Sequence, residues 1–400
     1  MSGNHLAGMQ TMDSVDVEGR RVFVRVDFNV PLDKDLQITD DSRIQAVLPT
    51  IRTLRERGAR VVLASHLGRP EGTVRPELSL EPVGARLAEL LGVEVLLPDD
   101  CVGNAPNKLI QNLREGQIML LENLRFHAEE TAGDENFARS LAGLADVYVN
   151  DAFGAAHRAH ASVVGVPRHV ADCAAGPLMA RELEAFEEIM TRPREPFVAI
   201  VGGAKVSDKI GVLGSLLGKV DSLLIGGAMA YTFLKAQGHD MGDSLVEDSK
   251  IDQAKNLLLK AKSRNVDILL PGDHVIVQEV DADAPTRIVA TGEVPEGWKA
   301  VDIGPDTRSL YAERVSQART VFWNGPMGIF EIDAFAAGTE GLAQAVAQSS
   351  ATSVVGGGDS VAAVRKAGVV PFITHVSTGG GASLELLEGK VLPGVEALQR

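Results

Sequence analysis

Short apolar runs alternate along most of the chain with segments whose apolar residues recur at helical spacing. Apolar runs bounded by glycine or polar residues are typical of strands that are buried on both faces. In the first half this pattern predicts strands at 21–26, 61–64, 117–121 and 146–149, with helices at 43–57 and 82–91. In the second half it predicts strands at 198–201, 222–225, 268–270, 320–323, 353–355 and 375–377. Strands that alternate with helices imply parallel sheets with right-handed crossovers, so we expect an α/β protein with doubly wound parallel sheets.

A helix near the middle of the chain divides it into two parts. Met179, Leu183, Phe186 and Met190 recur at helical spacing within 176–190, and a proline-containing stretch at 191–196 then ends the helix. The full length of 400 residues is too long for one ordinary core. We therefore expect two domains with their boundary close to this helix.

Cationic and hydrogen-bonding residues follow the predicted strands of the first half. In an open parallel sheet, the ligand crevice lies at the carboxyl ends of the strands. Arginine suits carboxylate and phosphate ligands, and several arginines in one crevice would repel one another without a shared anion. The pattern therefore predicts an anion site, although each arginine could instead pair with a local surface acid. The candidate residues are Asp27, Asn29, His66, Arg69, Arg125 and Arg158, together with Arg43 at the start of the first helix.

Glycine takes the place of arginine at the strand ends of the second half. The stretch 197–210 combines an apolar run with Gly202 and Gly203, and a helix is expected to begin there with Lys205 and Lys209 on one face. Free N–H groups and the positive dipole end of a helix favour phosphate. The alternative is an ordinary strand–helix connection with solvated lysines. Neither a P-loop nor a Gly-x-Gly-x-x-Gly motif is present at this position.

The glycine run at 356–360 is the clearest phosphate-binding candidate of the second half. Backbone N–H groups of such a turn suit an extended polyphosphate, and Asp359 within it could hold a Mg²⁺ that bridges phosphate oxygens. Asp359 could also be the N-cap of the following helix, or serve both purposes. One half of the chain is thus suited to a compact anionic acceptor and the other to a nucleotide.

Composition excludes several other classes of protein. The net charge of −15 argues against a general nucleic-acid binder. Cys101 and Cys173 have no Cys-x-x-Cys spacing, so neither a zinc nor a redox motif is visible, and we expect reduced, structural cysteines. We find no signal-peptide core and no run that could span a membrane, and therefore expect a cytoplasmic protein. The first ten or so residues have the character of a disordered tail.

Taken together and in order, the motifs closely resemble those of the phosphoglycerate kinase family. The likeness runs from about Asp13 to the C-terminus, and the ordered set is far more specific than any one motif. The stretches that carry it are Arg-Val-Asp-Phe-Asn-Val-Pro at 25–31, Ser-His-Leu-Gly-Arg-Pro at 65–70, Glu-Asn-Leu-Arg-Phe at 122–126, Ala-His-Arg-Ala-His at 156–160, Gly-Gly-Ala-Lys-Val-Ser-Asp-Lys at 202–209, Trp-Asn-Gly-Pro-Met-Gly at 323–328, Gly-Gly-Gly-Asp at 356–359 and Thr-Gly-Gly-Gly at 378–381.

The resemblance implies two Rossmann-like domains joined by a hinge helix, and a reaction between 1,3-bisphosphoglycerate and ADP that gives 3-phosphoglycerate and ATP with Mg²⁺. It also implies a monomer. The implied division is an N-terminal extension at 1–12, expected to be flexible, a phosphoglycerate-binding domain at 13–173, an interdomain helix and hinge at 174–194, a nucleotide-binding domain at 195–378, and a C-terminal segment at 379–400 that packs back on the first domain.

Matching positions give the residue roles that the resemblance implies. Substrate binding falls to Asp27, Asn29, Arg43, His66, Leu67, Gly68, Arg69, Arg125 and Arg158. Nucleotide binding falls to Gly203, Lys205, Lys209, Asn324, Glu331, Gly357, Gly358, Asp359 and Ser360, with Asp359 as the metal ligand. Stabilisation of the transferring phosphoryl group, the catalytic role, falls to Arg43, Lys205, Lys209, Gly357 and Gly358.

Two other functional classes are less consistent with these residues. A nicotinamide-dependent oxidoreductase should carry Gly-x-Gly-x-x-Gly after its first strand, which this chain lacks. A non-catalytic anion-binding protein would not need both Asp359 and the paired lysines.

Because the two half-sites belong to different domains, we expect domain closure, with hinges at 176–194 and 377–381.

Overall fold

The computed structural model describes residues 8–399, which form two compact units. Unit 1 contains the described residues up to Glu184 together with those from Val391 onward, and unit 2 is Ala185–Lys390. Each unit contains a six-stranded sheet whose strand pairs are all parallel, which confirms the expected fold class. None of the helices within 8–399 combines the length and apolar character that a membrane span requires.

The sheet of unit 1 has the strand order β3-β4-β2-β1-β5-β6. Its strands are β1 (Arg21–Arg25), β2 (Arg60–Ala64), β3 (Val95–Leu96), β4 (Ile118–Leu120), β5 (Val147–Asn150) and β6 (Asp172–Ala175). The four strands predicted in this half correspond to β1, β2, β4 and β5. The two edge strands were not predicted, because β3 is only two residues long and β6 is rich in alanine.

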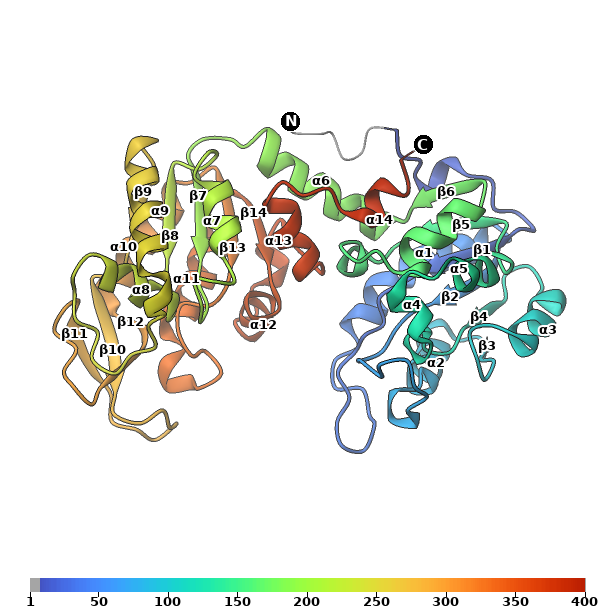
Figure 1. The fold of residues 1–400 in the computed structure, drawn as a ribbon, viewed down its shortest axis with the longest axis horizontal. Helices are drawn as coiled ribbons and strands as arrows, with labels where there is room; N and C mark the ends of the chain where they lie inside the picture. Colours follow the sequence, from blue (N-terminus) through green and yellow to red (C-terminus); the bar gives the residue numbers. More distant parts are fainter. Residues whose placement is uncertain (1–7, 400) are drawn as a thin grey trace. The chain divides into compact units, whose positions relative to one another are not determined.

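Figure 1 shows the helices of unit 1 around its sheet, and apolar residues of the first two belong to the core of this sheet. Ile44, Val47, Ile51 and Leu54 of α1 belong to the same buried core as the valines of β1 and β2. The predicted helical spacing is thus confirmed for this segment. The helices are α1 (Ser42–Glu56), α2 (Glu81–Leu91), α3 (Asn104–Asn112), α4 (Ala128–Ala132), α5 (Glu135–Ala142) and α14 (Pro393–Glu396), with a 3-10 turn η3 (Leu124–Phe126) after β4.

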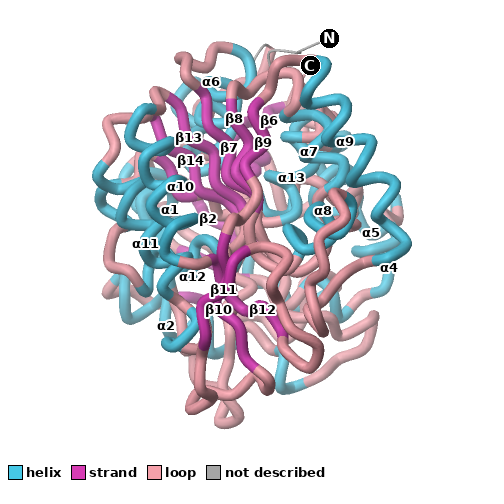
Figure 2. The backbone as a smooth tube through the Cα atoms, turned by 90° about the vertical axis from the view of Figure 1, so that its left-hand side faces the viewer, coloured by secondary structure: helices cyan, strands magenta, loops and turns pink. Residues whose placement is uncertain are grey.

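The parallel sheet of unit 2 has the order β15-β14-β13-β7-β8-β9, and helices cover both of its faces. Figure 2 shows its strands between α10, α11 and α12 on one side and α7, α8, α9 and α13 on the other. The strands are β7 (Phe197–Val201), β8 (Ser222–Ile225), β9 (Asp267–Leu269), β13 (Thr320–Asn324), β14 (Thr352–Gly356) and β15 (His375–Val376). The helices are α7 (Ile210–Leu216), α8 (Met229–Ala236), α9 (Ile251–Ser263), α10 (Pro305–Gln317), α11 (Ala337–Gln348), α12 (Gly358–Lys366) and α13 (Gly381–Leu387).

Unit 2 also contains a three-stranded antiparallel sheet that the sequence pattern did not predict. Its order is β11-β10-β12, with β10 (Asp273–Val277), β11 (Arg287–Ala290) and β12 (Lys299–Ile303). The edge strand β11 is largely exposed, so it lacks the alternation of apolar and polar residues that marks a half-buried strand.

The chain passes from unit 1 to unit 2 within α6 (Pro177–Thr191). Asp151, which follows β5, accepts hydrogen bonds from the N–H groups of Leu178 (2.8 Å) and Met179 (3.1 Å), so its carboxylate satisfies the free donors at the start of this helix.

Both described ends of the chain contact unit 1. Met9 forms a β-bridge with Gln399, Thr11 forms one with Ala175, and Met12 is buried. The N-terminal extension was predicted at 1–12. Its residues 1–7 are outside the described part of the chain, and its last residues lie on unit 1.

Candidate functional site

The carboxyl ends of β1 and β2 bring Asp27, Asn29, Arg43 and Gly68 together. One carboxylate oxygen of Asp27 accepts a charge-assisted hydrogen bond from the guanidinium of Arg43, and the other accepts the N–H of Asn29 at 3.2 Å. The side-chain oxygen of Asn29 in turn accepts the N–H of Gly68 at 2.8 Å. Burial alone would raise the pKa of the Asp27 carboxyl, but the electrostatic interaction with His66, followed by those with Arg43 and Arg25 and the N–H of Asn29, holds it below its usual value.

Arg25 and His66 form the buried floor of this group. Arg25 is completely buried and donates to the hydroxyl of Ser162 (2.9 Å) and to Nδ1 of His66 (3.1 Å). An arginine can only donate, so Nδ1 of His66 is an acceptor and Nε2 carries the proton. Burial holds the pKa of His66 well below its usual value. The charge of Asp27 opposes this effect, and the charges of Arg25, Arg125 and Arg43 add to it. His66 is therefore a neutral donor.

Arg125 is a cation held largely without an anionic partner. It follows β4 on the turn η3 and donates to the carbonyl of Gly68 at 2.8 Å. Its Nε is buried and has no hydrogen-bond partner among the described residues. Burial, aided by the charge of Arg25, lowers its pKa from 12.5 to about 10. A guanidinium in this situation is stabilised when an anion binds to it.

The remaining predicted residues of this half lie around the same group. Arg69 is exposed, and its charge contributes to the low pKa of Arg125. Arg158 is exposed, and its charge contributes to lowering the pKa of His160 to about 4, after burial and the charges of Arg125 and Arg25. Leu67 is only 2% exposed, so its contribution is to place the backbone and not to present a side chain.

Sequence reasoning missed the supporting residues Arg25, Ser65 and Asn123. The Asn123 side chain donates to the carbonyl of Leu67 at 2.7 Å, and the Ser65 hydroxyl accepts the N–H of Phe28 at 2.8 Å. A signal was present for Arg25, because a charged residue within an apolar run needs a buried partner. Nothing in the spacing distinguished Ser65 or Asn123 from ordinary loop residues.

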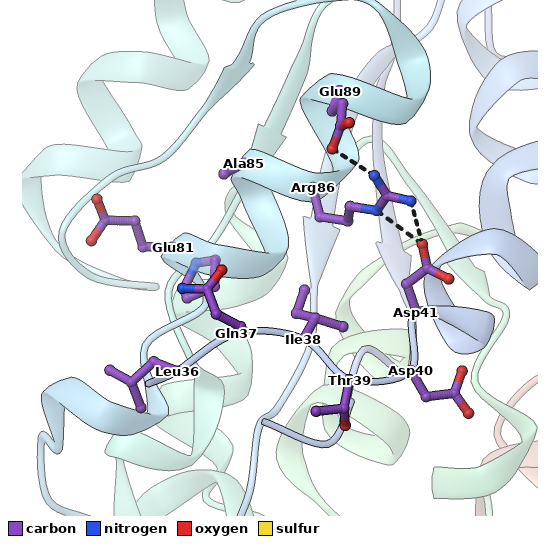
Figure 3. A pocket seen from close by; sticks show the side chains of 11 residues that line it. Leu36, Gln37, Ile38, Thr39, Asp40, Asp41, Glu81, Ala85, Arg86 and Glu89 are labelled. Atoms are coloured by element: carbon purple, nitrogen blue, oxygen red, sulfur yellow. Dashed lines mark hydrogen bonds and ion pairs between the residues drawn. The ribbon is translucent and has the colours of Figure 1, made fainter. Parts of the chain in front are cut away.

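A separate pocket of about 790 Å³ lies between the loop Leu36–Asp41 and helix α2, and it contains none of the predicted site residues. Its lining includes the carboxylates of Asp40, Asp41, Glu81 and Glu89. Figure 3 shows that its arginine, Arg86, points toward Asp41 and Glu89, with N–O distances of 2.8 and 2.5 Å. This acidic surface would repel a phosphorylated ligand, so it does not compete with the arginine group as an anion site.

In unit 2 the expected helix start at the glycine pair is wrong. The segment 202–209 is a loop, and α7 begins only at Ile210, so Lys205 and Lys209 do not share a helical face. A Cβ at Gly202 would lie 2.1 Å from the carbonyl oxygen of Pro326, so the chain's own backbone occupies the close approach that was expected for a ligand. Gly203 has φ of +114° and nothing within 4 Å of its Cβ position, which leaves this glycine open.

Lys209 and Asn324 meet at the carboxyl end of β13. The ammonium group of Lys209 donates to the side-chain oxygen of Asn324, whose amide nitrogen donates to the carbonyl of Gly356 at 2.8 Å. Burial lowers the pKa of Lys209, against the opposing charges of Asp359 and Asp208. Lys209 therefore lies within electrostatic reach of Asp359, as a shared phosphate site requires.

The run from Gly357 to Ser360 forms the start of α12. The N-cap is Gly357, with φ of +91°, and no side chain caps this helix, so the alternative that Asp359 is the N-cap is wrong. Gly358 and Asp359 are exposed in the first turn, where N–H groups are free of helical partners. The buried hydroxyl of Ser360 accepts the N–H of Gly325, which ties α12 to the loop after β13.

Two nucleotide-site candidates have looser connections to this group. Lys205 is exposed. Burial would raise the pKa of Glu247, but hydrogen bonds from Ser207 and Val206 lower it, and the charge of Lys205 contributes to the same effect. Glu331 is exposed in the loop that follows β13. The structure therefore brings Lys209, Asn324 and the start of α12 together, and leaves Lys205 and Glu331 at exposed positions.

Three comparisons identify proteins that are similar to this chain. The sequence model of the family "Phosphoglycerate kinase" matches residues 12–390. A phosphoglycerate kinase of Anaeromyxobacter sp. (strain K) is 55% identical, covering 98% of this chain and 99% of that protein. A cytosolic phosphoglycerate kinase of Nicotiana tabacum is 54% identical, covering 97% of each chain. The solved structure of phosphoglycerate kinase from Coxiella burnetii has a TM-score of 0.89 and 43% identity, covering 98% of each chain.

Proposed function

The chain belongs to the phosphoglycerate kinase family, and we infer that it catalyses reversible phosphoryl transfer between 1,3-bisphosphoglycerate with ADP and 3-phosphoglycerate with ATP. The observation that carries most weight is the state of Arg125. It is a partly buried cation among other cations, with an unpartnered Nε and a lowered pKa. A phosphorylated carboxylic acid supplies the negative charge that this group lacks.

We assign the acceptor half-site to unit 1, corresponding to a domain at 13–173. Arg43, Arg69, Arg125 and Arg158 provide positive charge for the phosphate and carboxylate of the glycerate. Asp27 and Asn29 can bind its hydroxyl and carboxyl groups, and the proton on Nε2 of His66 is a further donor. The backbone of Leu67 and Gly68 is held beside them by Asn123 and Asn29.

We assign the nucleotide half-site to unit 2, corresponding to a domain at 195–378. The free N–H groups at the start of α12, from Gly357 to Ser360, face the phosphates. Lys209 and Lys205 add positive charge, and Gly203, Asn324 and Glu331 complete the set. The arrangement of Lys209, Asn324 and α12 around the ends of β13 and β14 supports this assignment.

The residues present fit a Mg²⁺ that arrives with the nucleotide. Asp359 is an exposed carboxylate beside free backbone N–H groups, and its charge reaches Lys209. Mg²⁺ is commonly bound by one or two carboxylates together with substrate phosphates. When bound, it would neutralise charge on the phosphate oxygens. Asp359 would hold it there.

The chemistry needs positioning and charge stabilisation more than proton transfer. In the ATP-consuming direction the nucleophile is a carboxylate that is already ionised, so a general base is not required. Arg43, Lys205, Lys209 and the N–H groups of Gly357 and Gly358 stabilise charge on the transferring group.

Since the assigned residues come from both units, turnover requires the two bound substrates to meet and water to be excluded. We propose hinges at 176–194, within the interdomain segment 174–194, and at 377–381, with 379–400 as the segment that returns to unit 1. X-ray scattering should give a more compact profile with both substrates bound than with neither. Identical profiles would contradict the hinges. We further propose a cytoplasmic monomer.

Crossed binding measurements test these assignments. 3-Phosphoglycerate and MgADP are titrated separately by calorimetry into the unmodified protein, Arg43→Ala and Asp359→Ala. We expect Arg43→Ala to weaken 3-phosphoglycerate binding at least about tenfold and to leave MgADP binding unchanged, with the reverse for Asp359→Ala. If Asp359→Ala weakened only 3-phosphoglycerate binding, the two half-sites would be wrongly assigned.

A further inference from the structure

Asp100, Cys101 and His127 form a cluster on unit 1 that has no part in the proposed reaction. Asp100 and Cys101 precede helix α3, and His127 follows the turn η3. One ligand atom from each residue lies within 4.8 Å of the other two. We propose that these three residues bind a single divalent cation of the Zn²⁺ class.

The spacing of the three donor atoms suits such a cation. With metal–ligand bonds of about 2.0–2.3 Å in a tetrahedral site, donor atoms lie about 3.5 Å from one another. The cluster already falls within 4.8 Å, and the distance from His127 Nε2 to Asp100 Oδ1 is 2.7 Å. This pair therefore needs to open by less than about 1 Å to admit the ion, and the sulfur needs to approach by up to about 1.3 Å.

Neighbouring groups hold two of the ligands in place before any ion binds. Asp100 Oδ1 accepts the N–H of Cys101 at 2.6 Å, which fixes the carboxylate beside the cysteine. The His127 ring packs against Phe137, with ring centroids 5.1 Å apart. Restricting the orientation of a ligand in this way reduces the entropy lost on binding.

The charges around Cys101 favour a cation. Cys101 is buried, and the carboxylates of Asp100 and Glu130 act on its thiol through their negative charge. The same carboxylates attract a positive ion. Binding breaks the hydrogen bond between His127 and Asp100 and forms a metal–thiolate and a metal–imidazole bond. The thiol proton goes to solvent, and the neutral imidazole keeps its proton on Nδ1. A thiolate and an imidazole select Zn²⁺-class ions over Mg²⁺, which prefers oxygen ligands.

Two of the three ligands are accessible to solvent, and the third is buried. The side chains of Asp100 and His127 are 45% and 28% exposed, whereas Cys101 is 1% exposed. An ion therefore reaches the two exposed ligands from solvent, and the sulfur completes the site from below. The fourth position is left for water, as in three-ligand zinc sites.

Cobalt(II) provides the direct test, because a cobalt–thiolate bond gives a charge-transfer absorption in the near ultraviolet. Co²⁺ and then Zn²⁺ are titrated into the nucleotide-free full-length protein, Cys101→Ser and His127→Gln, with Cys173→Ser as the matched control for the other buried cysteine. We expect one equivalent of Co²⁺, displacement by Zn²⁺ but not by Mg²⁺, and affinity at least about tenfold weaker in the first two variants. The control should bind as the unmodified protein does.

Absence of the absorption in the unmodified protein would overturn the proposal, as would its loss in Cys173→Ser alone. The unmodified protein and His127→Gln decide the question if Cys101→Ser does not fold. An independent readout is proton release, which should accompany Zn²⁺ binding to the unmodified protein and be absent for Cys101→Ser. Equal proton release from both would also refute a thiolate ligand.

Discussion

Replacing Arg125 by methionine should separate stability from function at the acceptor half-site. Methionine keeps most of the length and the apolar stem of the side chain but removes its charge. We expect the ligand-free variant to be as stable as the unmodified protein, or slightly more stable, while 3-phosphoglycerate binding becomes much weaker.

The magnitude follows from the environment of Arg125. A fall in pKa from 12.5 to about 10 corresponds to roughly 3 kcal/mol against the charged form, if solvent did not screen it. Because the group is only partly buried, we discount this to about 1–2 kcal/mol. Losing the hydrogen bond to the Gly68 carbonyl costs about 1 kcal/mol. The free energy of unfolding of Arg125→Met should therefore exceed that of the unmodified protein by about 0 to 1 kcal/mol.

Arg21 is the matched control, since it is an arginine of similar burial with a full partner. Its guanidinium bonds both carboxylate oxygens of Asp146, at 2.6 and 3.0 Å, and this interaction raises the pKa of Arg21. Arg21→Met should therefore destabilise the protein by about 1–2 kcal/mol.

Urea unfolding of both variants measures the stabilities, and the KM for 3-phosphoglycerate measures the function. Arg125→Met should raise that KM at least about tenfold, because hydrogen bonds to a charged ligand are worth about 1.5–3 kcal/mol each. The reasoning is refuted if Arg125→Met destabilises the protein as much as Arg21→Met and leaves the KM unchanged.

Three further perturbations test other parts of the structure. Lys209→Ala should lower kcat by orders of magnitude with little effect on 3-phosphoglycerate affinity. The control is Lys235→Ala, which removes a surface lysine paired with Asp240 and should leave kcat unchanged. Loss of 3-phosphoglycerate binding in Lys209→Ala would instead assign Lys209 to the other half-site. Gly202→Ala should destabilise unit 2 by more than about 2 kcal/mol, because the new Cβ would meet a carbonyl oxygen at 2.1 Å. Gly214→Ala in α7 is the control: its Cβ meets nothing within 4 Å, and the change should stabilise by about 0.5–1 kcal/mol. Equal thermal midpoints for the two variants would contradict this. Burial of His160 lowers its pKa to about 4, so the unfolded chain binds more protons than the folded one between about pH 6.5 and 4. The free energy of unfolding should therefore decrease as the pH is lowered through that window, by up to about 1.4 kcal/mol per pH unit. His160→Asn should show a shallower dependence on pH, and an unchanged dependence would exclude His160 as the cause.

The strands that were predicted correctly are those with a strong local pattern. β1, β2 and β7 are runs of four or five buried residues bounded by polar or glycine positions, so burial on both faces is visible in their composition. β3 and β11 lack this pattern, because the first has two residues and the second is exposed. Their pairing depends on neighbouring strands that are distant in the sequence.

The helix expected at Lys205 shows where local reasoning fails. Spacing alone placed Lys205 and Lys209 on one face. Instead, Gly202 packs against Gly325 and Pro326 of a distant loop, the N–H of Gly203 donates to the carbonyl of Pro326, and the chain does not become helical until Ile210. Tertiary contacts therefore override the periodic pattern here.

The candidate site was predictable where residues follow strands, and less so beneath them. Asp27, Arg125 and Asn324 stand at strand ends, where parallel topology gathers side chains. Arg25 lies within a strand, and its contacts with Ser162 and His66 join residues far apart in the sequence. The cluster of Cys101 and His127 was invisible for the same reason.

The most direct test of the proposed function is a coupled turnover assay. Purified protein is supplied with 3-phosphoglycerate and MgATP, and product is followed through glyceraldehyde-3-phosphate dehydrogenase as loss of NADH absorbance. Turnover by the unmodified protein that Asp359→Ala abolishes is the expected result. Folded protein that binds both ligands but gives no turnover would contradict the kinase assignment and indicate a binding role or a different acceptor.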